Sequence, residues 1–147
     1  MHKKLVNKEQ RGATAVELAL ILPLLVLLVF AIIEFSLLLY NQAMITNASR
    51  EGSRVGVVWG PDYGGQSYRI SRNEIIDHVE LWLGNNLISF SESNARITPE
   101  NPDEVCSGEV IDKLLKVRVE YDYSFLFLPL ATVTLSSEAN MRCESTE

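Results

Sequence analysis

Residues 18–33, LALILPLLVLLVFAII, form a run of sixteen residues without a charge, and this run decides how the rest of the chain is arranged. The apolar character resumes at Phe35 and continues to Tyr40. Glu17 and Glu34 flank the run, and on a helix they would lie about 25 Å apart, close to the ~30 Å hydrocarbon core of a bilayer. Carboxylates at the two edges cost less than one at the centre. The sequence therefore predicts a membrane-spanning helix over about residues 17–40.

Basic residues lie almost entirely on one side of this apolar run. The first base after it is Arg50, whereas four bases precede it with only Glu9 against them. The positive-inside rule then predicts a cytoplasmic N-terminus and an outside location for everything after about Tyr40. The preceding bases are Lys3, Lys4, Lys8 and Arg11.

Two alternatives to a permanent membrane helix fit the sequence less well. A core helix of a soluble protein is disfavoured because a chain of 147 residues has too little other sequence to surround it. A cleaved secretory signal should have an apolar region of about 7–15 residues ending at small residues. The run here is longer and ends at Glu34 and Phe35. We therefore expect the apolar helix to stay with the protein.

The junction between the basic leader and the apolar run resembles a prepilin signal. Gly12 follows the leader, and Glu17 lies five residues later at the start of the apolar run. The resemblance implies that a prepilin peptidase, a membrane-embedded aspartic protease, cuts after Gly12 and makes Ala13 the new N-terminus. The α-ammonium of Ala13 and the carboxylate of Glu17 would then be four residues apart on one helix face. In assembled pilins this glutamate neutralises the N-terminus of a neighbouring subunit; the alternative is a carboxylate favoured only by the helix dipole.

A more specific resemblance extends over about the first 55 residues. The segments that carry it are residues 12–20, Leu22-Pro23-Leu24, Ile33-Glu34-Phe35 and residues 47–54, NASREGSR. These are similar to the TadE-like family of minor pseudopilins, which serve tight-adherence, or Flp-type, pilus systems. The resemblance implies that Glu17 and Glu34 take part in assembly or recognition. The chain departs from common pilin signatures at Leu18, where Phe is usual, and at Ala13, where an aromatic residue is usual.

Three segments follow: a basic leader over residues 1–12, a long helix over 13–57 that is first hydrophobic and then amphipathic, and an exported domain over 58–147. Ser71 and Glu74 form a capping-box pattern that begins a second helix, with apolar residues from Ile75 to Leu83, and Gly84 is expected to stop it. Residues 115–123 and 133–141 alternate as strands of an antiparallel hairpin, residues 95–98 form a short strand, and 59–67 and 99–112 form loops. The expected fold is α+β and pilin-like.

Small side chains recur every fourth residue on the outer part of the long helix, at Ala48, Gly52 and Gly56. Such a stripe lets another helix or a sheet approach closely. The alternative is that the two glycines simply end the helix. Both remain open from the sequence.

The two cysteines, Cys106 and Cys143, are too far apart for a CxxC pattern. Because an exported domain meets an oxidising compartment, we expect one disulfide between them; the alternative is two unpaired buried thiols. The acidic residues around the 99–112 loop do not have the spacing of a calcium loop, so a solvated loop is favoured. We expect no metal site.

A net charge of −6 argues against a nucleic-acid partner. The sequence contains no nucleotide loop, zinc spacing, nucleophile elbow or Cys-His pair, so we expect no enzyme activity, no cofactor and no small-molecule substrate. The hypothesis is a minor pilin or pseudopilin that contributes to assembly of a tight-adherence pilus. Its expected partners are the inner membrane, the prepilin peptidase, other pilin subunits and the assembly machinery. The alternative is a single-span anchor whose outer domain binds a ligand or surface and does not polymerise.

Overall fold

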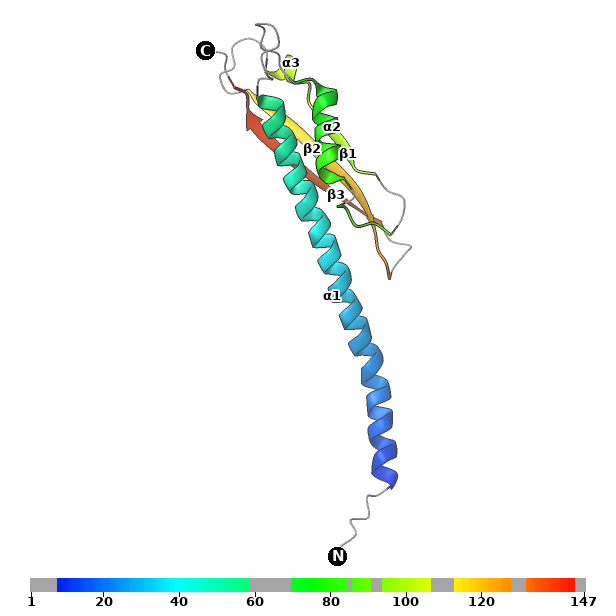
Figure 1. Ribbon diagram of the computed structural model, residues 1–147. Coiled ribbons are helices and arrows are strands. Elements are labelled where there is room, and N and C mark those ends of the chain that lie inside the picture. The colour runs from blue at the N-terminus through cyan, green and yellow to red at the C-terminus, as the bar shows by residue number, and fades with distance from the viewer. Residues whose placement is uncertain are drawn as a thin grey trace, which may run out of the picture. The chain divides into compact units, whose positions relative to one another are not determined.

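The computed structural model describes residues 8–58, 70–84, 86–90, 94–106, 113–127 and 132–144, with side chains from Gly12 onward (Figure 1). The chain divides into two compact units, Met1–Ser36 and Leu37–Glu147, and each is described by itself. The loop predicted over residues 59–67 lies outside the described residues, as does the later part of the loop predicted over 99–112.

The first unit is helical. Helix α1 spans Lys8–Val57, and its part up to Ser36 belongs to this unit. Every residue from Gly12 to Ile33 is exposed, and Pro23 lies inside the helix. Among the described residues, α1 is the one helix that is long and apolar enough to cross a membrane. Such a large exposed apolar surface is not stable in water, and it fits a single-pass membrane anchor.

The second unit combines the outer part of α1 with two further helices and a three-stranded antiparallel sheet. Helix α2 spans Arg72–Leu83 and α3 spans Pro102–Val105. Strand β2, Leu114–Ser124, is central, with β1, Arg96–Pro99, on one edge and β3, Thr132–Arg142, on the other. This arrangement confirms the predicted α+β fold with a long N-terminal helix, a small helix and an antiparallel sheet.

Strand β2 confirms the predicted alternation. Its register with β3 pairs Val117 with Ala139 and Tyr121 with Leu135, so the two strands form the expected hairpin. One face of β2 is buried because its apolar residues from Leu115 to Tyr123 point to the helical layer, while Leu114 is exposed and the charged residues of the strand point away. The buried residues of this face are Leu115, Val117, Val119, Tyr121 and Tyr123.

Helix α2 begins and ends as its sequence predicted. The Ser71 side chain accepts a hydrogen bond from the Glu74 backbone N–H, and the Glu74 carboxylate accepts one from the Ser71 N–H at 2.7 Å. These two bonds form the capping box. At the other end, Gly84 has a φ of +45°, which favours glycine, and it ends the helix.

The apolar positions of α2 are not all part of the core. Its buried face consists of Ile75, Val79 and Leu83. Leu81, by contrast, is 82% exposed. Two residues along a helix correspond to about 200° of rotation, so Leu81 lies on the side opposite Val79 and Leu83.

The segment after β1 differs from the prediction of a plain loop. Residues Pro102–Val105 form the single turn α3, whose N-cap is Asn101, with its side chain accepting a hydrogen bond from the Asp103 N–H. Asn followed by Pro is a helix-start signal, because Pro fits the first helical position and needs no N–H partner there. This turn brings Cys106 to the end of the sheet.

Candidate processing and assembly segment

The predicted cleavage site lies within α1, which begins at Lys8. Gly12 and Ala13 are both exposed, and a Cβ added to Gly12 would meet nothing within 4 Å. Packing therefore does not explain a glycine at this position. A glycine weakens a helix interior by about 1 kcal/mol relative to alanine, so the backbone at Gly12 is easier to unwind than its neighbours.

The two glutamates of α1 lie in different surroundings. Glu17 is exposed, four residues after Ala13 and so on the same face of the helix. Glu34 is 7% exposed and counts among the buried charged residues. The sequence pattern predicts equivalent boundary charges at the two ends of the apolar run, but only Glu17 is available to a neighbouring molecule without rearrangement.

The outer part of α1 packs closely against α2 and β2 through its small residues. A Cβ added to Gly52 would lie 2.7 Å from Val79 Cγ2 and 3.0 Å from Val117 Cγ1. One added to Gly56 would lie 2.5 Å from Leu115 Cδ2. Neither position has room for a side chain. The stripe, which also includes the fully buried Ala48, brings the helix and the sheet of the same chain together, and α1 ends at Val57 just after Gly56.

Hydroxyl groups next to this stripe bind strand β3. Ser49 and Ser53 are both fully buried. The Ser53 hydroxyl donates to the Ala139 carbonyl at 2.9 Å, and the Ser49 and Ser137 hydroxyls are 3.0 Å apart. Because buried polar groups are costly unless paired, these bonds fix how α1 lies on the sheet. The sequence shows the serines beside the glycines, but it does not reveal their partners on β3.

Asn41 is a structural residue that sequence reasoning missed. It is fully buried, its side-chain N–H donates to the Ile88 carbonyl at 2.6 Å, and its side-chain oxygen accepts from the Ile88 N–H at 2.9 Å. The Tyr121 hydroxyl donates to the same Ile88 carbonyl at 3.2 Å. Three bonds thus hold the segment after α2 against α1 and β2. The available signal was an amide residue placed directly after the apolar run.

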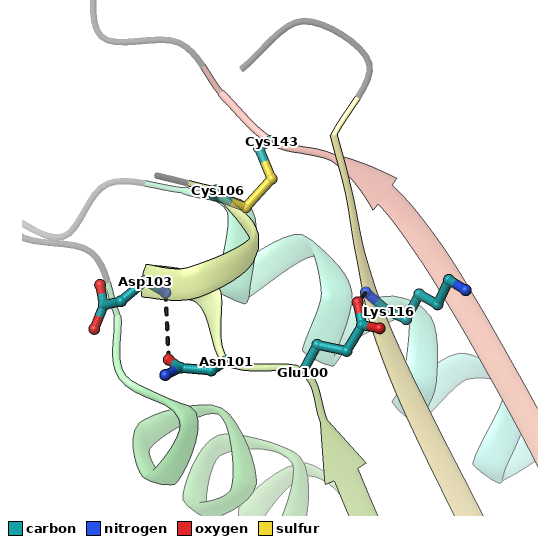
Figure 2. Close-up of a disulfide and its surroundings, with 6 residues drawn as sticks. All are labelled: Glu100, Asn101, Asp103, Cys106, Lys116 and Cys143. Atoms are coloured by element: carbon teal, nitrogen blue, oxygen red, sulfur yellow. Dashed lines mark hydrogen bonds between the residues drawn. A yellow bond between two sulfur atoms is a disulfide. The ribbon is translucent and has the colours of Figure 1, made fainter. Parts of the chain in front are cut away.

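Cys106 and Cys143 form a disulfide, with their Cα atoms 5.6 Å apart (Figure 2). The bond joins the end of α3 to the residue after β3. Nearby, the Glu100 carboxylate accepts a hydrogen bond from the Lys116 N–H at 3.2 Å. Within the described residues, no group of three or more His, Cys, Asp or Glu side chains could hold a metal ion.

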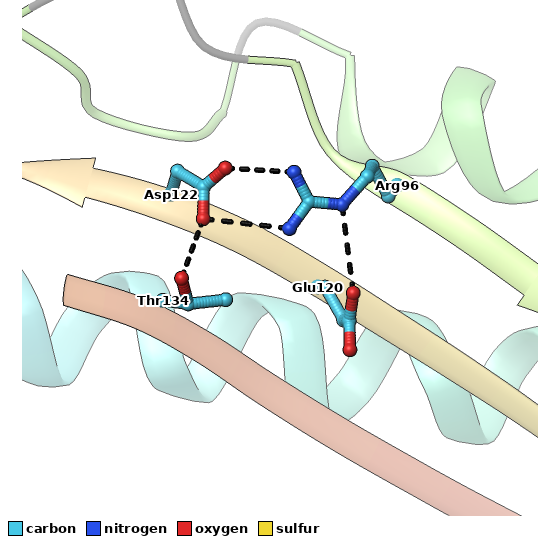
Figure 3. Close-up of polar contacts among 4 residues, drawn as sticks. All are labelled: Arg96, Glu120, Asp122 and Thr134. Atoms are coloured by element: carbon cyan, nitrogen blue, oxygen red, sulfur yellow. Dashed lines mark hydrogen bonds and ion pairs between the residues drawn. The ribbon is translucent and has the colours of Figure 1, made fainter. Parts of the chain in front are cut away.

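The sheet face turned away from the core carries cross-strand ion pairs. Arg96 of β1 pairs with Asp122 at 2.7 Å and with Glu120 at 3.5 Å, and Thr134 of β3 donates to Asp122 at 2.7 Å (Figure 3). The hydrogen bonds from Arg96, followed by that from Thr134, hold the pKa of the Asp122 carboxyl below its ordinary value. These groups are exposed, so the pairs contribute little stability.

Comparison with known proteins supports the sequence resemblance over one part of the chain. The family model described as TadE-like protein matches residues 12–54. No curated protein and no solved structure matches the chain. The matched residues include the exposed apolar part of α1, the predicted cleavage site, both glutamates and Gly52 of the small-residue stripe. Residues 12–54 are therefore similar to the TadE-like family, as the resemblance implied.

Proposed function

We propose that this chain is a minor pilin or pseudopilin that contributes to assembly of a tight-adherence pilus. In this proposal α1 anchors it in the bacterial inner membrane, with the N-terminus in the cytoplasm and the second unit outside. The observation that carries the proposal is the coincidence of the TadE-like match with the wholly exposed apolar part of α1. The family match supports an association with pilus machinery in general, and the charge distribution of the sequence supports the orientation.

The exposed apolar surface of α1 can contact lipid before assembly and neighbouring subunits in the assembled fibre. Before assembly, lipid covers residues 12–33. In a fibre, the same surface would be covered by the apolar helices of neighbouring subunits. Glu17 would then lie in a medium of low dielectric constant, where attraction to the α-ammonium of a neighbour's Ala13 is stronger than in water. A structural subunit of this kind requires no active site, and we propose that the chain is not an enzyme.

The proposal requires processing after Gly12, and this can be tested directly. Mass spectrometry of the protein from a strain that contains its prepilin peptidase should show Ala13 as the N-terminus. Gly12→Leu should abolish processing, because a bulky side chain replaces the residue at the cut. Since nothing lies near this position, the variant should fold normally. Finding only full-length chain in cells that make pili would contradict the proposal and favour a permanent anchor that does not polymerise.

The second prediction concerns the charge of Glu17. Glu17→Gln keeps the size of the side chain but removes the negative charge, so membrane insertion should be retained or improved while pilus assembly falls severalfold. Membrane fractionation measures the first effect, and the amount of sheared surface pili measures the second. The conservative variant Glu17→Asp should restore part of the assembly. Normal pilus assembly with Glu17→Gln would mean that Glu17 is only a carboxylate favoured by the helix dipole.

A further inference from the structure

The exposed residues on the outer part of α1 form one row. Between Asn41 and Val57, the exposed residues are Ala43, Asn47, Arg50 and Arg54. Their spacing of four, three and four residues puts them on a single face, because a helix turns about 100° per residue. This face is opposite to the side that carries Gly52, which packs against α2 and β2. We call these four residues the outer row.

The charge of the outer row is positive, and part of it is unpaired. The Arg54 guanidinium pairs with the Glu51 carboxylate at 2.7 Å, within α1 itself. The Arg50 guanidinium, one helix turn earlier, has no hydrogen-bond or ion-pair partner among the described residues. Arg50 is therefore an exposed cation that is available to another molecule, and it lies inside the TadE-like match of residues 12–54.

The face of α2 turned away from α1 has the opposite charge. Asp77, Glu80 and Leu81 are exposed on this face, at positions i, i+3 and i+4 of the helix. Neither carboxylate has an ion-pair partner in the parts of the chain that the structure describes. We call these three residues the α2 patch. It presents one largely exposed apolar side chain beside two carboxylates.

The outer row and the α2 patch have complementary charges but are turned away from each other within one chain. Helix α2 packs on α1 with its other side, where Ile75 and Val79 lie close to Gly56 and Gly52. A contact between the two surfaces must therefore join two copies of the chain, and it joins two different surfaces. Such a heterologous contact leaves one free surface at each end, so it can continue into a filament.

The direction of the two helices fits a contact between copies that point the same way. Ile75 lies near Gly56 and Val79 lies near Gly52, so α2 runs antiparallel to the outer part of α1. In a fibre whose subunits share one direction, α2 of one copy also runs antiparallel to α1 of the next. With Asp77 beside Arg50, Leu81 would lie about 6 Å further along, between Asn47 and Ala43. These two side chains are shorter than the arginines and leave room for a leucine.

We propose that the α2 patch of one copy of this chain docks on the outer row of a second copy, with Asp77 and Glu80 beside Arg50. Exposed ion pairs contribute little affinity, so the charges would set the register of the contact while burial of Leu81 supplies attraction. Copies held in one membrane meet at a high effective concentration, so a weak contact suffices. The proposal rests on the proposed function, because it requires copies that are anchored side by side.

Disulfide crosslinking between two differently tagged chains tests this contact. In the pilus-producing strain, one full-length chain would carry Asn47→Cys, and a second, with a larger tag, would carry Glu80→Cys. Cys106 and Cys143 stay bonded to each other. After mild oxidation, the mixed dimer should exceed either homodimer severalfold, because the contact joins the outer row to the α2 patch. A homodimer in excess would overturn the proposal, since it would pair a surface with itself.

Charge reversal gives a readout that is specific to the ion pairs. Arg50→Glu in the first chain should reduce the mixed dimer severalfold, and Asp77→Arg in the second chain should then restore it. Both residues are exposed, so the variants should keep the melting temperature of the natural chain. Lys116→Glu is the matched control, because it reverses an exposed charge on the sheet face turned away from the core and should leave the mixed dimer unchanged. Equal losses with Arg50→Glu and Lys116→Glu would overturn the proposal.

The N-terminus and the surface pili of the same cells separate failure of this contact from failure of the proposed function. Ala13 as the N-terminus and normal pili, with no mixed dimer, would overturn the contact and leave the pilus subunit standing. Only full-length chain in cells that make pili, with no mixed dimer, would overturn both. Crosslinking of either chain to a different pilin subunit, in place of the mixed dimer, would assign the surface to that subunit and overturn the contact between copies.

Discussion

The two parts of α1 have the same secondary structure and opposite surroundings. Residues 12–33 are exposed throughout, whereas the outer part from Asn41 to Val57 buries a stripe of glycine, alanine and serine. The first part is made of large apolar side chains that suit lipid, and the second of small ones that let a sheet approach. The large apolar side chains of residues 12–33 are thus left for a medium that the chain does not itself provide, whereas the small residues Ala48, Gly52 and Gly56 are buried within the second unit.

The largest effect on the packed part should come from the disulfide. Cys106→Ser should lower the melting temperature of the full chain in detergent micelles strongly. The two cysteines are 37 residues apart, and the chain-entropy model gives a loss of about 4 kcal/mol for a loop of that size. Cys143→Ser and the double variant should show the same loss, since all three remove one bond. Two free thiols in labelling of unreduced protein would contradict the disulfide.

A matched pair of glycine variants compares the two parts of α1 directly. Gly56→Leu should destabilise the second unit by about 1–3 kcal/mol or more, because its new Cβ alone would lie 2.5 Å from Leu115 Cδ2. Gly12→Leu should leave the melting temperature unchanged. Circular dichroism melts of the full chain in detergent measure both. If both variants lowered the melting temperature equally, the two parts of α1 would not differ in how closely they are packed.

The smallest loss of stability should come from changes on the sheet face turned away from the core. Because the pKa of Asp122 is lowered in the folded state by Arg96 and Thr134, its ionised form adds stability above the unfolded pKa, and this is lost as pH falls through the folded value. The melting-temperature difference between the natural chain and Asp122→Asn should therefore be small at neutral pH and shrink once the pH falls below the ordinary value of 3.8. If the melting-temperature difference grew as the pH was lowered, ionised Asp122 would not be the stabilising form.

Local patterns in the sequence predicted much of this fold. The uncharged run, the capping box at Ser71 and the alternation of β2 each depend on nearby residues, so each can be recognised without knowing the partner. Asn41 could not be assigned in this way, because its partner Ile88 is 47 residues away. The exposure of Leu81 was also missed, since apolar residues are common on protein surfaces.

The polar bonds between α1 and β3 also determine how the second unit responds to force. Gln42 donates to the Ser136 carbonyl, Ser49 contacts Ser137 and Ser53 donates to the Ala139 carbonyl, so the contacts are spread over about 16 Å of helix. Tension applied along the axis of α1 would load these bonds together, in shear, instead of breaking them one after another. The second unit would then resist being peeled from its helix while the helix is pulled.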